Sequence, residues 1–104
     1  MFKLQPNPTF IATVLITIPG QVEPIPLEIE FKYLGVKAGQ AFFDGLSGKR
    51  DDVVLAEIVV GWCGVDTDFS VDALTTLLDN YPHSGAAIFE TYCKKTLEAG
   101  RKNF

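Results

Sequence analysis

Hydrophobic and polar residues alternate in two stretches of the N-terminal third. Residues 9–18 place apolar side chains at every second position, with threonines and two aliphatic residues between them. Residues 25–34 alternate more strictly, because Glu28, Glu30 and Lys32 separate the apolar positions. A period of two is typical of a strand with one buried face. With the turn-like residues 19–24, the pattern predicts an antiparallel hairpin, in which Pro26 is tolerated only near a strand start or at an edge.

Apolar residues recur at helical spacing in the rest of the chain. Acidic residues at 51 and 52 followed by apolar positions 55, 58, 59 and 62 predict a helix from about Asp52 to Trp62. Ser70 is a suitable N-cap for a second helix, which Pro82 ends. A glycine-interrupted segment from Gly35 to Gly48 predicts one short helix.

The last predicted helix covers residues 84–99, with Gly100 as its stop. It is expected to bury Ile88, Phe89, Tyr92 and Leu97. The elements together predict an α+β fold, an N-terminal antiparallel β-hairpin followed by three to four packed helices. We expect one domain over residues 1–104, with the hairpin at about 9–34 and the helical part at about 36–99, since a chain of this length has room for a single core.

Composition and charge exclude several classes of partner. The chain is 47% hydrophobic and 21% charged, as in a folded globular protein. Its net charge of −4 argues against nucleic acid and anionic membranes as partners, because both attract clustered lysine and arginine. No apolar run follows the first charged residues, and none is long enough to cross a bilayer. Two cysteines thirty positions apart, Cys63 and Cys93, in a chain without a signal peptide fit a reducing cytoplasm, which we therefore expect.

Motifs that suggest chemistry are incomplete. Residues 66–72 carry oxygens at calcium-loop spacing but lack the required glycine and the final glutamate. Residues 45–50 lack the spacing of a phosphate loop. His83 has no identified partner for catalysis, and with Cys63 and Cys93 it offers no close pair of zinc ligands. The two cysteines could form a disulfide only if their Cα atoms lie within about 7 Å. The sequence therefore predicts no enzyme, no cofactor and no metal site.

The predicted hairpin needs a cover, because two strands alone are marginally stable in water. Its mixed face carries Ile11 and Leu15, and both of its edges are free of blocking residues over much of their length. We expect the hairpin to act in assembly, through another copy or a partner chain. Trp62 is read mainly as a core residue and, secondarily, as part of a partner groove. Ile11, Leu15 and the Trp62 region are the predicted partner-binding residues.

Five short motifs, spread over nearly the whole chain, resemble the tail assembly chaperones of long-tailed bacteriophages and prophages. They are the opening FKLQPNPTF at residues 2–10, EIEFKY at 28–33, VVGW followed by GVD at 59–66, LLDNYP at 77–82 and AAIFE at 86–90. The resemblance supplies no functional side chains that could be carried over to this chain.

The resemblance implies a non-enzymatic protein of the bacterial host cytoplasm that binds the tape measure protein. Such a protein would keep its client soluble and help tail tube subunits to polymerise around it, and it would associate with itself. The tail tube protein is then a further partner. The alternative is a small structural tail or head-tail connector protein, which would remain in purified particles.

Overall fold

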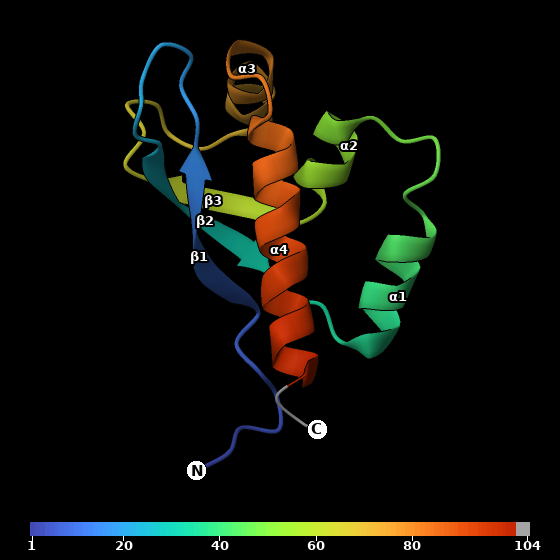
Figure 1. Cartoon of the computed structure of the whole chain (residues 1–104). Helices are drawn as coiled ribbons and strands as arrows, with labels where there is room; N and C mark the ends of the chain where they lie inside the picture. Colours follow the sequence, from blue (N-terminus) through green and yellow to red (C-terminus); the bar gives the residue numbers. More distant parts are fainter. Residues whose placement is uncertain (102–104) are drawn as a thin grey trace.

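The computed structural model describes residues 1–101, and these contain a three-stranded antiparallel sheet and four helices (Figure 1). The expected α+β class is thereby confirmed. Side chains are described as far as residue 97. The elements in chain order are β1 (Thr9–Ile16), β2 (Ile25–Lys32), α1 (Val36–Asp44), α2 (Asp51–Ala56), β3 (Val59–Cys63), α3 (Val71–Asn80) and α4 (Ser84–Arg101).

The predicted hairpin is confirmed, with both strands two residues shorter than expected. Thr9 lies opposite Lys32 and Ile16 lies opposite Ile25, so the register is continuous along β1 and β2. Pro26 is the second residue of β2 and lies outside the part of that strand that pairs with β3. Its missing N–H therefore costs the sheet no ladder bond to β3.

The prediction of one helix from Asp52 to Trp62 is wrong beyond Ala56. Helix α2 ends there, and its last turn closes with the N–H groups of Glu57 and Ile58 bonding to Val54 and Leu55. The chain then enters β3, which pairs with the second edge of β2, and the Lys32 N–H donates to the Ile58 carbonyl at 2.7 Å. Residues 59–63 thus form a strand because they pair with the free edge of β2, although their apolar residues have helical spacing. The expectation that both hairpin edges are free is corrected for β2.

A bulge interrupts β3. Ile29 lies opposite Trp62 and Phe31 lies opposite Val59. Between these two pairs β3 therefore has one residue more than β2. An extra residue shifts the alternation of side chains by one position. Val59 and Trp62 therefore both lie on the face of the sheet that carries the buried residues Ile29 and Phe31.

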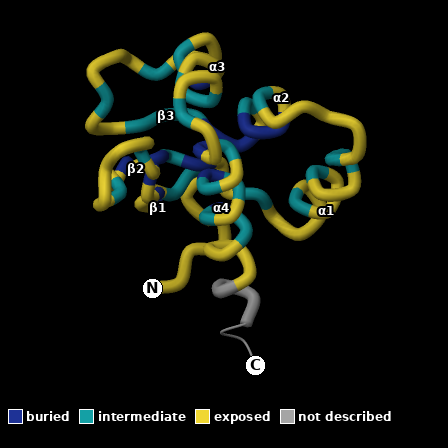
Figure 2. Tube along the Cα trace, turned by 45° about the horizontal axis from the view of Figure 1, so that its top comes forward, coloured by how far each residue is buried: buried dark blue, intermediate teal, exposed yellow. Residues whose placement is uncertain are grey.

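Helix α4 lies across one face of the sheet and contacts β1 most, whereas α1 stands to the side (Figure 1). Burial alternates along the hairpin, and Figure 2 shows buried positions in the strands and α2 but none in α1. The core consists of apolar residues from the sheet and from α2, α3 and α4: Ala12, Val14, Ile16, Leu27, Ile29, Phe31, Leu55, Ile58, Val59, Leu74, Ile88 and Tyr92. Of the residues expected inside α4, Ile88 and Tyr92 are buried, Phe89 is half-buried and Leu97 is exposed.

Helices α3 and α4 join through a tight turn. The Ala73 N–H donates to Ser70 Oγ at 3.0 Å, which confirms Ser70 as the N-cap of α3. His83 has a φ of 74°, an unusual conformation for a residue with a side chain, and Ser84 is buried where α4 begins. Helix α4 continues through Gly100 to Arg101, so the predicted stop at Gly100 is wrong.

Candidate functional site

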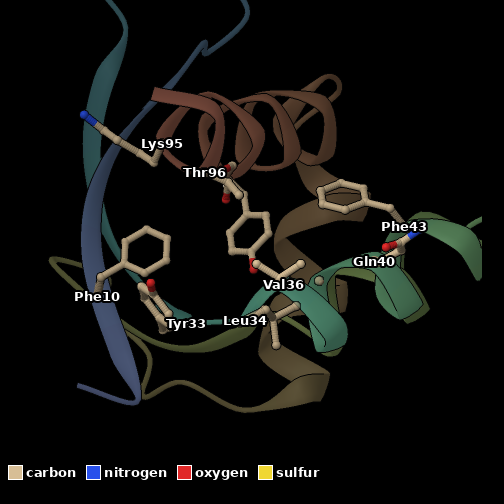
Figure 3. Close-up of a pocket in the computed structure, with 11 residues that line it drawn as sticks. Phe10, Tyr33, Leu34, Val36, Gln40, Phe43, Lys95 and Thr96 are labelled. Atoms are coloured by element: carbon tan, nitrogen blue, oxygen red, sulfur yellow. Dashed lines mark hydrogen bonds between the residues drawn. The ribbon is translucent and has the colours of Figure 1, made fainter. Parts of the chain in front are cut away.

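A groove of about 650 Å³ lies between α1, α4 and the end of the hairpin (Figure 3). One wall is the face of α1 that carries Val36, Gly39, Gln40 and Phe43. These positions follow the i, i+3, i+4, i+7 spacing of a single helix face. Helix α1 therefore turns one complete stripe toward the groove.

The other wall and the floor come from α4 and the strands. Helix α4 contributes Tyr92, Lys95 and Thr96, again on one helix face, and the hairpin end contributes Phe10, Tyr33 and Leu34. Figure 3 shows Phe10 and Tyr33 on one side of the hollow and Phe43 on the opposite side. The lining is mostly apolar and aromatic, which is typical of a site that binds a ligand or a partner segment.

Helix α1 is held to the body of the protein mainly by aromatic contacts. The Phe42 ring lies 6.2 Å from the Tyr92 ring, and the Phe43 ring lies 6.4 Å from the Phe89 ring, both edge to face. The helix has nine residues, no buried residue, and no side-chain cap at Gly35. A helix this short is marginal by itself. These aromatic pairs therefore set the width of the groove.

Tyr92 links the groove to the core. Its ring lies 5.9 Å from Phe10 and 5.3 Å from Phe31, and its hydroxyl donates to the Lys32 carbonyl at 3.3 Å. Burial raises the pKa of the Tyr92 phenol, and the neighbouring Cys93 adds to that effect. The floor of the groove is consequently a neutral phenol fixed by packing and by one hydrogen bond.

The outer face of the sheet is the second candidate surface. Ile11 and Leu15 lie there with 64% and 56% of their surface exposed. They are four residues apart on one strand, a separation of about 13 Å, with Thr13 between them. Two isolated aliphatic side chains are common on protein surfaces. The outer face is therefore less apolar than the groove.

Carboxylates occupy the middle of this outer face. Thr9 Oγ1 donates to Glu30 Oε2 at 2.7 Å, and Thr13 Oγ1 donates to Glu28 Oε1 at 2.5 Å. Gly61 lies opposite Glu30, and a Cβ atom at Gly61 would come within 3.0 Å of Glu30 Oε1. The outer face thus has an acidic centre on β2 beside an apolar margin on β1.

The free edge of β1 belongs to the same margin. In the part of the chain that the structure describes, β1 pairs with β2 alone. The Tyr33 N–H donates to the Pro8 carbonyl at 2.9 Å, so even-numbered residues of β1 bond to β2 in the alternating antiparallel pattern. The backbone groups of Thr9, Ile11, Thr13 and Leu15 accordingly point to the free edge.

Trp62 lies on the opposite side of the sheet from Ile11 and Leu15. It is half-buried against the core, its ring lies 5.1 Å from the Phe69 ring, and its Nε1 donates to the Thr67 carbonyl at 2.9 Å. The structure therefore brings Ile11 and Leu15 onto one surface but separates Trp62 from them. None of the three residues lines the groove. The sequence did not predict the residues that do.

The remaining candidates of the sequence analysis are dispersed. Cys63 is an exposed free thiol and Cys93 a half-buried one, and burial raises the pKa of the Cys93 thiol, with a smaller effect of Glu90. His83 is exposed in the turn before α4. Among the described residues, no three His, Cys, Asp or Glu side chains are grouped to hold a metal ion. No helix in that part of the chain could span a membrane.

Comparison with known families gives a match over nearly the whole chain. The family model described as phage tail assembly chaperone matches residues 1–103. No curated protein and no solved structure matches the chain. The match includes all the elements that form the sheet, the core and the groove. The chain therefore belongs to the phage tail assembly chaperones, a non-enzymatic family that acts on proteins of the phage tail.

Proposed function

We propose that this chaperone binds the tape measure protein in the bacterial host cytoplasm and keeps it soluble while the tail is assembled. The groove between α1 and α4 is the observation that carries the proposal. An amphipathic helix binds to a partner by laying its apolar face into a hydrophobic groove. Two helix faces and an aromatic floor provide such a groove here.

Val36 offers a direct test of groove binding. It lines the groove with 88% of its surface exposed, so Val36→Asp changes the groove without opening the core. Val22→Asp is the matched control, because Val22 is 96% exposed in the hairpin loop. Co-expression with the tape measure protein should give less soluble client with Val36→Asp than with wild type or Val22→Asp. An equal amount of soluble client with all three proteins would show that the groove does not bind the client.

The outer sheet face remains a predicted contact surface, with Ile11 and Leu15 as its apolar residues and the Trp62 region as a separate contribution. Replacing Ile11 and Leu15 by Ser should weaken client binding while the protein still unfolds cooperatively, since both side chains are largely exposed. Unchanged client binding by the double variant would show that this face does not contact the client, without contradicting the proposed function.

We also propose that copies of the chaperone associate through the free edge of β1. The strand has eight residues with no proline, glycine or charge, so it lacks the usual devices that protect an edge. Concentration-dependent light scattering should show association, and the amides of Thr9, Ile11, Thr13 and Leu15 should gain protection from exchange with it. A monomer at millimolar concentration would contradict the proposal.

The tail tube protein is proposed as a further partner, which polymerises around the client that the chaperone holds. A chaperone of this kind leaves before the tail is complete. Mass spectrometry of purified particles should therefore detect tape measure and tube proteins but not this chain. Its stable presence in particles would favour a structural tail or head-tail connector protein instead.

A further inference from the structure

Lysines outnumber acidic residues beside the positions that line the groove. Residues 32–43 and 91–97 carry four lysines, and the acidic residues Asp44, Glu90 and Glu98 directly flank them, in a chain with a net charge of −4. Among the lining residues the charged one is Lys95 (Figure 3). Lys37 follows the lining residue Val36 on α1 and is exposed. A local excess of one charge around a cleft attracts a partner of the opposite sign.

The α1 wall of the groove is as long as a short partner helix. Helix α1 has nine residues and is about 13 Å long, which matches two to three turns of a partner helix. Val36 and Phe43 lie at the two ends of the α1 stripe and are both exposed. A partner helix can therefore place apolar side chains between them while its polar face stays in water.

We propose that the groove binds an amphipathic helix of the client that carries acidic residues beside its apolar stripe. The apolar stripe lies against α1 and α4, and the acidic residues lie near Lys37 and Lys95. This inference rests on the proposed function, and it names the kind of client segment that is recognised. It also accounts for an acidic protein that carries four of its seven lysines in the segments around this groove.

Two other occupants fit these charges less well. The N-terminal residues 1–8 have exposed apolar side chains, but Lys3 is their charged side chain and no acidic residue accompanies it. Helix α3 of a second copy carries Asp72 and Asp79. Its apolar positions pack inward, however, and leave Val71 as its exposed large apolar residue. A client helix supplies both the apolar stripe and the acidic charge.

Charge reversal tests the inference with a matched control. Lys37→Glu with Lys95→Glu changes the net charge by the same amount as Lys49→Glu with Arg50→Glu, and residues 49 and 50 lie outside the groove lining. The probe is a set of overlapping 30-residue peptides of the tape measure protein, and the readout is the dissociation constant by fluorescence anisotropy. The groove variant should bind about tenfold more weakly than wild type, and the control should bind within about twofold. Thermal unfolding of each free variant shows that it is folded.

The identity of the bound peptides gives a second readout. We expect those that bind to combine an apolar helical stripe with Asp or Glu, to bind more weakly when these become Asn or Gln, and to lose affinity as salt is raised. Binding should protect the amides of α1 from exchange. Tight binding of neutral or basic peptides, or equal binding by both charge variants, would overturn the inference and leave client binding intact. Failure of every peptide and of the intact tape measure protein to bind wild type would instead overturn the proposed function. If the groove variant changed its oligomeric state but bound the peptides as tightly as wild type, the occupant of the groove would be a second copy of this chain instead.

Discussion

The Tyr92 hydroxyl gives the sharpest prediction about stability. Tyr92→Phe keeps the ring among Phe10, Phe31 and Phe42 and removes one hydrogen bond, the 3.3 Å contact to the Lys32 carbonyl. The change should lower the free energy of unfolding at pH 7 by about 1 kcal/mol. For a domain of about 100 residues this corresponds to a Tm lower by about 4–8 °C.

The pH dependence of this difference has a definite sign. The pKa of the Tyr92 phenol is raised above 10.0 in the folded state, so the native protein keeps this proton at a pH where the unfolded chain has lost it. The stabilisation is complete below the unfolded pKa of about 10 and is lost as pH rises through the folded pKa. Tyr92→Phe has no such proton. The stability gap between wild type and variant should therefore narrow above pH 10.

Urea unfolding followed by the fluorescence of Trp62, the single tryptophan, measures both effects at pH 7, 9.5 and 10.5. Tyr33→Phe is the control, because that tyrosine is half exposed and its hydroxyl should contribute little. A loss below about 0.3 kcal/mol at pH 7, or a gap that widens with pH, would refute the role given to the Tyr92 hydroxyl.

Three further predictions follow from single contacts. Ser70→Ala removes the side-chain cap on Ala73 and should lower the free energy of unfolding by about 1 kcal/mol in a urea titration; an unchanged midpoint would show that the cap is dispensable. With Ellman's reagent at pH 8, Cys63 should react before Cys93, because Cys63 is exposed and the raised pKa of Cys93 lowers the fraction of its thiolate form. Mass spectrometry of labelled peptides gives the order, and faster labelling of Cys93 would contradict its partial burial in α4. Ile88→Ala leaves a cavity under α4 and should cost about 2–5 kcal/mol; a cost below about 1 kcal/mol in calorimetry would contradict the packing described.

Local sequence predicted the elements whose signals agree with one another. The hairpin combines a period of two with a turn, and α3 combines an apolar stripe with a serine cap and a proline stop. The segment from Val59 to Cys63 has conflicting signals. Its apolar positions continue the helical spacing of α2, whereas valine and tryptophan favour strands. The free edge of β2 resolves that conflict, because residues 59–63 can pair with it. The spacing of apolar residues within one segment carries no information about such a distant edge.

The groove was not predictable from the same patterns. Its walls are two helices about fifty residues apart in sequence, and the contacts of Phe42 with Tyr92 and of Phe43 with Phe89 hold them together. One signal was present in the sequence: residues 32–43 and 91–97 carry four of the seven lysines of an acidic chain. Ile11 and Leu15 were correctly expected on an exposed strand face, since alternation alone determines which side they share.

Client binding is tested directly by co-expression with the tape measure protein, followed by size-exclusion chromatography with light scattering. If the chaperone binds this client, we expect a soluble complex with several copies of the chaperone for each client. The complex should be depleted by Val36→Asp but not by Val22→Asp. An insoluble client beside a free, folded chaperone would contradict the claim that this protein binds and shields the tape measure protein.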